Sequence, residues 1–302
     1  MSNRKPTDLL KAQSRGRFFT NGLFPFAELS RHEGIINLID TETGLVRSLI
    51  AMEENMTAFS LLVPDFFRIR RGVSPSGSVP LPRSGSYLEI DGKAISLEDC
   101  PLWNGTPPHY PAREERIKRE LSLLTAQLDP GESFLTLLGK EDRTVFQKKA
   151  REITGGQREL GKVLPEGLEQ LIGLGPGLTP AGDDFLTGVL LAQNHFPACP
   201  PMDTQKIEER LKQTTAPGRT MLYGAIRGSF PAFILKYLEE RESVVSEEEI
   251  LTSLKRAARH GSTSGRDCLA GYYWSLSRFL SDWPQKASTF PVENEAGLGT
   301  DA

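Results

Sequence analysis

The segment Gly173–Gly188, GLGPGLTPAGDDFLTG, constrains the fold of this chain more than any other feature. It holds five glycines and two prolines, where average usage would give about one glycine. Glycine permits positive φ and close backbone approach, and each proline restricts both itself and the residue before it. The pattern then turns apolar and helical. The segment therefore predicts a tight turn that leads into a buried helix, Asp183–Phe196, whose first N–H groups can meet a small ligand.

The adjacent aspartates Asp183 and Asp184 stand at the start of this predicted helix. One interpretation is purely structural, because an acidic residue in the first turn stabilises a helix by about 0.3–1 kcal/mol. Neighbouring side chains diverge around a helix with 3.6 residues per turn, so one carboxylate can orient the loop while the other faces a ligand or a metal. We expect at least one to act in chemistry, and the residues alone do not say which.

A second loop, His260–Asp267 (HGSTSGRD), joins the end of one predicted helix to the start of another. It combines three hydroxyls with a glycine and with Arg266, whose guanidinium suits a carboxylate or a phosphate. His260 either stabilises the end of its own helix or polarises a carbonyl. A well-capped helix start is the structural alternative.

We predict that the two loops converge on one small anionic or polar ligand. The expected catalytic residues are Asp183, Asp184, His260 and Asp267. The expected substrate-binding residues are Gly175, Gly177, Thr179, Gly182, Ser262, Thr263, Ser264, Gly265 and Arg266.

The rest of the chain divides into a strand-rich part and a helical part. Short apolar runs separated by turn residues predict strands at Gly34–Asp40, Leu45–Ile50 and Thr57–Val63, and a hairpin at Ser84–Leu97 around Asp91-Gly92. After a proline-rich stretch the periodicity becomes helical, and Ser246 with Glu249 forms a capping box. We expect an α+β protein with a β-rich domain at 1–110, a helical domain at 111–283 and a disordered tail at 284–302. The β-rich domain is expected to be a platform for assembly, without a role in chemistry.

Composition limits the class of protein. A formal net charge of -3 gives no reason to expect nucleic acid or an anionic membrane as a partner. No apolar run approaches the length of a membrane span, and the N-terminus lacks a secretory signal, so we expect a cytoplasmic protein. The 3 cysteines and 4 histidines show no metal-binding spacing. His195, near the end of the predicted buried helix, is a candidate stabilising cation.

The glycine-rich segment, together with HGSTSGRDCLAG at His260–Gly271, resembles the AllH family. The likeness extends from the strand Gly34–Asp40 to the last helix. The resemblance implies one subunit of an oxamate carbamoyltransferase of anaerobic allantoin breakdown. That enzyme exchanges a carbamoyl group between oxalurate and phosphate, giving oxamate and carbamoyl phosphate. The implied partners are a subunit similar to succinyl-CoA synthetase and an AllG-like subunit. The resemblance assigns no catalytic residues.

Two other functions fit the same residues. Asp183, Asp184 and Asp267 are oxygen donors of the kind that Mg²⁺ prefers, as in the aspartate-lined helical site of ADP-ribosylglycohydrolases. A magnesium-dependent hydrolase is therefore the first alternative, whereas the transferase requires no cofactor. A non-catalytic scaffold, whose glycine-rich loop docks a partner subunit, is the second.

Overall fold

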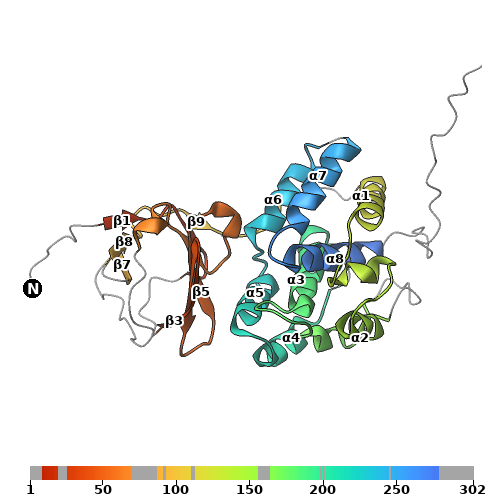
Figure 1. Ribbon diagram of the computed structural model, residues 1–302, viewed down its shortest axis with the longest axis horizontal. Coiled ribbons are helices and arrows are strands. Elements are labelled where there is room, and N and C mark those ends of the chain that lie inside the picture. Colours follow the sequence, from red (N-terminus) through yellow and green to blue (C-terminus); the bar gives the residue numbers. More distant parts are fainter. Residues whose placement is uncertain are drawn as a thin grey trace, which may run out of the picture.

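The computed structural model describes residues 9–19, 26–69, 87–90, 93–109, 113–155, 164–197, 199, 201–244 and 246–278. Within these residues the chain forms strands first and helices afterwards, and the two kinds of element occupy opposite ends of an elongated molecule (Figure 1). The predicted α+β fold is confirmed. The last strand ends at Trp103 and the first α-helix begins at Glu114.

The strands form two sheets. Six strands pair in the order β3-β4-β5-β6-β2-β9, and three pair in the order β1-β8-β7. Their bounds are β1 Leu9–Lys11, β2 Ser14–Gly16, β3 Phe26–His32, β4 Ile35–Asp40, β5 Val46–Ile50, β6 Ser60–Leu62, β7 Tyr87–Ile90, β8 Lys93–Ser96 and β9 Leu102–Trp103. The predicted strands correspond to β4, β5 and β6, and the predicted hairpin to β7 and β8. Its turn, Asp91-Gly92, lies outside the described residues.

Strand β3 was not predicted. It pairs with β4 along its length, with an irregularity between Glu28 and Ser30. Most of its side chains are half-buried and only Phe26 is buried. A strand without a clearly apolar face lacks the alternation by which strands are found in a sequence.

Eight α-helices are described in the helical region. They are α1 Glu114–Gln127, α2 Val145–Ile153, α3 Ala181–His195, α4 Thr204–Arg210, α5 Ala216–Ile226, α6 Ala232–Arg241, α7 Glu247–Ala258 and α8 Ser264–Ser277. The capping box at Ser246 and Glu249 is confirmed. Between α1 and α2, Phe134–Leu138 forms a 3-10 helix. In α6 the buried Ile234, Leu238 and Arg241 have helical spacing.

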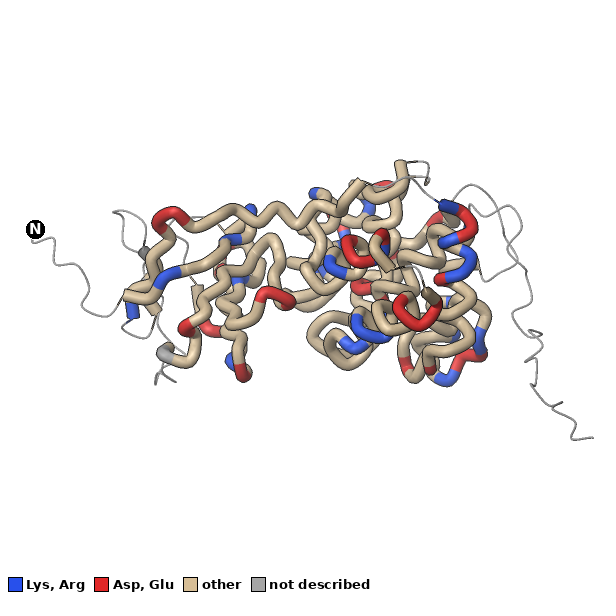
Figure 2. Tube along the Cα trace, turned by 90° about the horizontal axis from the view of Figure 1, so that it is seen from above, with Lys and Arg blue, Asp and Glu red and all other residues tan. Residues whose placement is uncertain are grey.

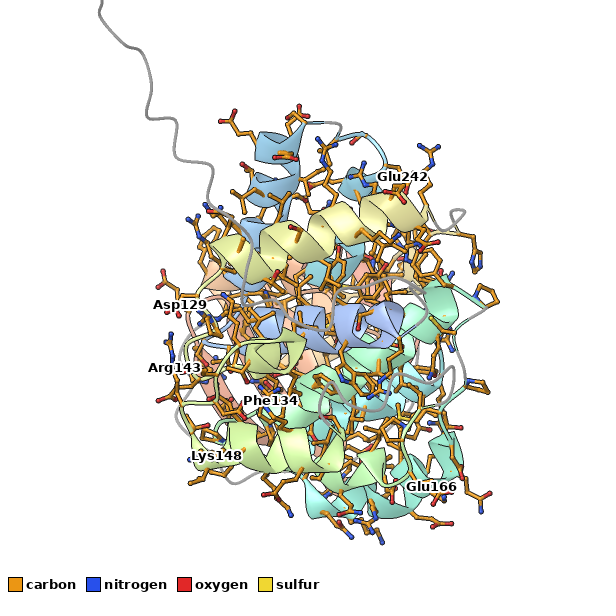
Figure 3. The ribbon with its side chains drawn as sticks, turned by 90° about the vertical axis from the view of Figure 1, so that its right-hand side faces the viewer. Asp129, Phe134, Arg143, Lys148, Glu166 and Glu242 are labelled. Atoms are coloured by element: carbon orange, nitrogen blue, oxygen red, sulfur yellow. The ribbon has the colours of Figure 1, made fainter. Side chains whose placement is uncertain are left out.

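Helix α3 lies at the centre of the helical region, as its apolar sequence predicts, and packs against α8. Two glycines permit an unusually close approach of these helices. A Cβ added to Gly188 would lie 2.0 Å from the carbonyl oxygen of Cys268, and one added to Gly271 would lie 1.9 Å from that of Phe185. Seen from the end opposite the strands, α8 crosses the region between α1 and α2 (Figure 3).

The two regions are joined by hydrogen bonds between residues far apart in the sequence. The Val46 amide donates to Thr220 Oγ1 at 2.7 Å. The amide of Phe230 donates to the carbonyl of Gly105 at 2.8 Å, and that of Ala232 to Met56 at 2.8 Å. Strand β5, the loop before β6 and the segment after β9 therefore face α5 and the start of α6.

Charged residues of both signs are interspersed over the described part of the helical region (Figure 2). The division into domains at residue 110 stays a prediction, and the tail 284–302 lies outside the described residues. No helix in the described part of the chain is long and apolar enough to cross a membrane. The three cysteines are free thiols.

Candidate functional site

The two loops singled out in the sequence meet. Thr179 Oγ1, in the glycine-rich loop, lies 3.0 Å from Ser264 Oγ, at the start of α8, although 85 residues separate them. The contact follows from the packing of α3 on α8, because each helix begins directly after one of the two loops. The predicted convergence of the loops on each other is therefore observed.

A cavity of about 190 Å³ lies beside this contact, between the helices and the strands. Since drug-sized ligands occupy pockets of roughly 300–1,000 Å³, a cavity of this size suits a smaller molecule. The helical region contributes Thr179, Asp184, Pro217, Thr220, Met221, Gly224, Ser229, Phe230, Pro231, Phe233, His260 and Ser264 to its lining. The strand region contributes Asn37, Val46, Ser48, Thr57, Ala58 and Phe59.

Asp184 is the carboxyl group of this cavity. Its side chain is 1% exposed, and its Oδ2 has no hydrogen-bond partner among the described residues. Burial raises the pKa of Asp184 well above its ordinary value, and the neighbouring Asp267 raises it further, whereas the hydroxyls of Ser264 and Thr179 lower it. Burial therefore favours the protonated form of Asp184, which offers one donor and one acceptor.

Asp267 lies behind Asp184 and does not line the cavity. It is fully buried, and its Oδ1 accepts a hydrogen bond from the Phe134 amide at 2.6 Å. Burial raises the pKa of Asp267 to about 7, against the lowering effect of the Phe134 amide and the Thr263 hydroxyl. Because two nearby buried carboxyls cannot both ionise cheaply, a charge on Asp267 favours the protonated form of Asp184.

Asp183 has a structural position. Its Oδ1 accepts a hydrogen bond from the Gly173 amide at 2.8 Å, and its Oδ2 accepts one from the Thr214 hydroxyl. Burial raises the pKa of Asp183 to about 6, and these two hydrogen bonds lower it. Asp183 thus ties the glycine-rich loop to the segment before α5. The structure answers the question that the sequence left open, since Asp184 is the member of the pair that faces the cavity.

His260 lines the cavity and stacks face to face on Phe233, with 3.9 Å between the ring centroids. Burial lowers the pKa of His260, and the carboxylate of Glu54 opposes that effect. The imidazole is therefore neutral at neutral pH. A neutral imidazole carries one donor and one acceptor nitrogen, so it can donate to a carbonyl oxygen.

The four glycines predicted to bind substrate shape the loops instead of lining the cavity. Gly175 and Gly177 adopt φ values of 113° and 103°, which side chains rarely adopt. A Cβ on Gly182 would lie 1.8 Å from the carbonyl oxygen of Leu171, and one on Gly265 would lie 2.0 Å from that of Ala257. At Gly182 and Gly265, any side chain would therefore clash with the backbone of a neighbouring segment.

The remaining predicted binding residues, Ser262, Thr263 and Arg266, are absent from the described cavity lining. Arg266 Nη2 donates to the Ser262 carbonyl at 2.5 Å, within its own loop. Thr263 directly precedes α8, with its hydroxyl near Asp267.

The helix-start amides that were expected to hold an anion are also engaged. The Gly182 amide donates to the Leu174 carbonyl at 2.8 Å, and the amides of Asp183 and Asp184 donate to Pro180. The first turn of α3 therefore satisfies its own N–H groups, and the anion site expected there has no free donors among these three.

The strand side of the cavity was missed in the sequence, where the β-rich part was given no role in the site. Ser48 Oγ donates to Asn37 Oδ1 at 2.7 Å, and Asn37 Nδ2 donates to Ser30 Oγ at 2.9 Å. An asparagine inside the apolar run GIINLID was the available signal, because an amide in such a strand requires polar partners.

The described residues do not place three or more His, Cys, Asp or Glu side chains together for a metal ion. Asp183 already uses both oxygens on protein donors. The set of three aspartates in the magnesium-dependent alternative is therefore not assembled in the described part of the chain.

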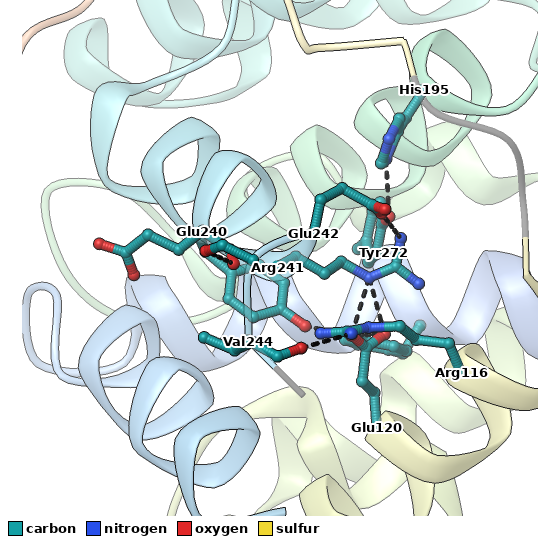
Figure 4. Close-up of polar contacts among 11 residues, drawn as sticks. Arg116, Glu120, His195, Glu240, Arg241, Glu242, Val244 and Tyr272 are labelled. Atoms are coloured by element: carbon teal, nitrogen blue, oxygen red, sulfur yellow. Dashed lines mark hydrogen bonds and ion pairs between the residues drawn. The ribbon is translucent and has the colours of Figure 1, made fainter. Parts of the chain in front are cut away.

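A second group of buried polar residues lies elsewhere in the helical region, around the ion pair of Arg241 and Glu120 (Figure 4). Arg241 Nε donates to both carboxylate oxygens of Glu120 at 2.8 Å, and the Tyr273 hydroxyl donates to Glu120 Oε2 at 2.9 Å. His195 Nδ1 lies 2.8 Å from the Tyr272 hydroxyl. Burial, and then Arg241, lowers the pKa of His195 to about 4. The prediction of a cationic His195 was therefore wrong, because a neutral imidazole fits this buried position.

Fold and site together describe an α+β protein with a small, largely uncharged cavity between a strand region and the starts of two packed helices. Residues 171–276 match the model of a protein family described as oxamate carbamoyltransferase subunit AllH. The resemblance drawn from the sequence is confirmed over this segment, which carries Thr179, Asp184, His260 and Ser264. The strand region lies outside it. No curated protein and no solved structure matches the chain.

Proposed function

We propose that this chain is a subunit of an oxamate carbamoyltransferase. We further propose that the cavity between the helices and the strands, called the junction cavity below, holds the carbamoyl group during transfer. The match to the family over residues 171–276 supports the activity. The position of Thr179, Asp184, His260 and Ser264, which belong to that segment, on the cavity supports the site. The proposed role is in anaerobic allantoin degradation.

The proposed reaction exchanges one bond for another. A phosphate oxygen attacks the carbamoyl carbon of oxalurate, and the bond between that carbon and the oxamate nitrogen breaks. The nitrogen gains a proton as it leaves, giving oxamate and carbamoyl phosphate. In the opposite direction the side chain that supplied this proton takes it back from the nitrogen of oxamate.

The proposal depends mainly on the position and burial of Asp184. It is a buried carboxyl group that lines the cavity, and one of its oxygens has no hydrogen-bond partner among the described residues. Burial favours its protonated form. A general acid is most effective when it holds its proton near the working pH and gives it up readily. Asp184 is proposed to protonate the departing nitrogen. Neutral His260 and the hydroxyls of Thr179 and Ser264 are proposed to donate to the carbamoyl oxygen, on which charge develops.

The family's description as a subunit implies a complex. The proposed partners are a subunit similar to succinyl-CoA synthetase and an AllG-like subunit. Oxalurate and carbamoyl phosphate are anions, so their charged ends require cations. The described residues lining the cavity include no Lys or Arg. The partners are proposed to supply those cations.

The test is Asp184→Asn in the reconstituted complex. Asparagine has the same shape and cannot donate a proton to the leaving nitrogen, so kcat is expected to fall about 100-fold or more, with little change in KM. Asp203→Asn, at the N-cap of α4 and away from the cavity, is the matched control and is expected to keep full turnover. Full turnover of Asp184→Asn would contradict the proposed role of Asp184 as the acid.

A further inference from the structure

We propose that the junction cavity binds the uncharged carbamoyl group of a substrate, H₂N–C=O, and excludes phosphate and carboxylate groups. The cavity would then take the ureido end of oxalurate and leave its anionic end outside. This inference rests on the proposed function only for the identity of the natural substrate.

The charge of the cavity is the first argument. Asp184 and His260 are the only ionisable side chains among its described lining residues, and neither is a fixed cation. Burial favours the neutral form of both. A phosphate that entered would lose its hydration without meeting an opposite charge, which is strongly unfavourable.

The arginines around the junction have other partners. Arg47 lies between the lining residues Val46 and Ser48, so its side chain points to the opposite face of β5. There it pairs with Asp40 at 3.3 Å and donates to the Phe18 carbonyl at 2.7 Å. Arg219 donates to the Leu211 carbonyl at 3.0 Å. These guanidinium groups are committed to holding the fold.

Backbone amides give an anion no alternative at α3, because the N–H groups of Gly182, Asp183 and Asp184 all donate within the protein. Most hydroxyls of the lining are also satisfied. Thr220 Oγ1 accepts from the Val46 amide, and Ser229 Oγ donates to the Asn104 carbonyl at 2.7 Å.

What remains for a ligand is a small set of groups around Asp184. Asp184 lines the cavity together with Thr179 and Ser264, whose hydroxyls interact with its carboxyl group and lie 3.0 Å from each other. A protonated carboxyl presents an O–H donor and a C=O acceptor on one planar group. A primary amide carries both a C=O acceptor and N–H donors. Its N–H can donate to the carboxyl C=O, while the hydroxyls of Thr179 and Ser264 donate to its oxygen. Phe59, Met221 and Phe230 supply apolar walls around a group of this size.

The experiment uses the full chain labelled with ¹³C at its methionine methyls, because Met221 lines the cavity and is one of only 5 methionines. N-methylurea, acetate and inorganic phosphate are titrated separately, and Met221→Leu assigns the signal. N-methylurea is expected to shift the Met221 methyl resonance saturably and to bind about tenfold or more tightly than either anion. The exposed Met52 serves as the internal control and is expected not to move.

Asp184→Leu removes both hydrogen-bonding groups and is expected to abolish the N-methylurea shift. Asp184→Asn keeps a donor and an acceptor and is expected to retain it. Equal or tighter binding of phosphate or acetate by the native chain overturns the inference, and so does the absence of a Met221 shift with N-methylurea. If Asp184→Leu fails to fold, the selectivity of the native chain still decides the matter. Failure of the reconstituted complex to transfer carbamoyl groups would overturn the proposed function and leave this binding result untouched.

Discussion

At the residue scale, three buried aspartates have different partners and therefore different roles. Asp183 uses both oxygens to fix the glycine-rich loop. Asp267 uses one oxygen on the Phe134 amide and does not line the cavity, whereas Asp184 does. Each of these two residues has one oxygen without a hydrogen-bond partner among the described residues. Burial raises the pKa of all three. Asp183 and Asp184 are the same residue type, so their different surroundings make one a structural residue and the other a candidate acid.

Asp267 gives a pH prediction. Its pKa rises from an ordinary 3.8 to about 7 in the folded protein, so the folded state holds this proton more tightly than the unfolded state. The stabilisation is complete below about pH 4 and is lost as the pH rises through 7. The free energy of unfolding of the native chain, relative to that of Asp267→Asn, should therefore fall by up to about 4 kcal/mol between pH 4 and pH 7. Urea unfolding across that range measures it, and a constant difference between the two proteins would contradict it.

At the element scale, the close approach of α3 and α8 brings the two loops together. Gly188 and Gly271 permit it from opposite sides, because each faces a carbonyl oxygen of the other helix. The distance between Thr179 and Ser264, and hence the cavity beside them, depends on this packing.

Gly188→Ala tests that dependence. The added Cβ would lie 2.0 Å from the Cys268 carbonyl oxygen, so the helices must separate. We expect a loss of stability of about 3 kcal/mol or more, measured by urea unfolding, because overpacking against backbone is poorly relieved. Gly224→Ala in α5 is the matched control. Its Cβ would meet the Ser229 carbonyl oxygen at 3.2 Å, and a much smaller loss is expected. Equal losses of stability in the two variants would show that α3 and α8 can move apart at little cost, and would contradict this prediction.

At the scale of the whole molecule, the strand region completes the cavity. Six of its residues form one wall, and the Val46 amide depends on Thr220 in α5 for its hydrogen bond. The helical region, which carries the family match, therefore contains only part of the site.

Thr220→Val tests the coupling of the two regions. Valine keeps the shape and removes the acceptor, so the buried Val46 N–H loses its partner. A stability loss of about 1–3 kcal/mol is expected, with the circular dichroism of strands and helices changing in one transition on urea unfolding. Thr220→Ser keeps the hydroxyl and should lose less. Native-like stability of Thr220→Val would mean that the hydrogen bond contributes little to holding the regions together.

The sequence by itself determined the features that depend on a few neighbouring residues. Glycine and proline located the turn before α3, apolar periodicity located the buried helix, and Ser246 with Glu249 located the start of α7. These signals are local because φ restriction and capping act within a single turn of chain.

Only the tertiary structure decided which of these features form the site. It turned Asp184 toward the cavity and Asp183 away from it, kept Arg266 on its own loop, and brought Asn37 and Ser48 of the strands to the opposite wall. Each outcome depends on contacts between residues that are distant in the sequence. Local patterns cannot specify such contacts, because burial and hydrogen-bond partners are set by the packing of whole elements against one another.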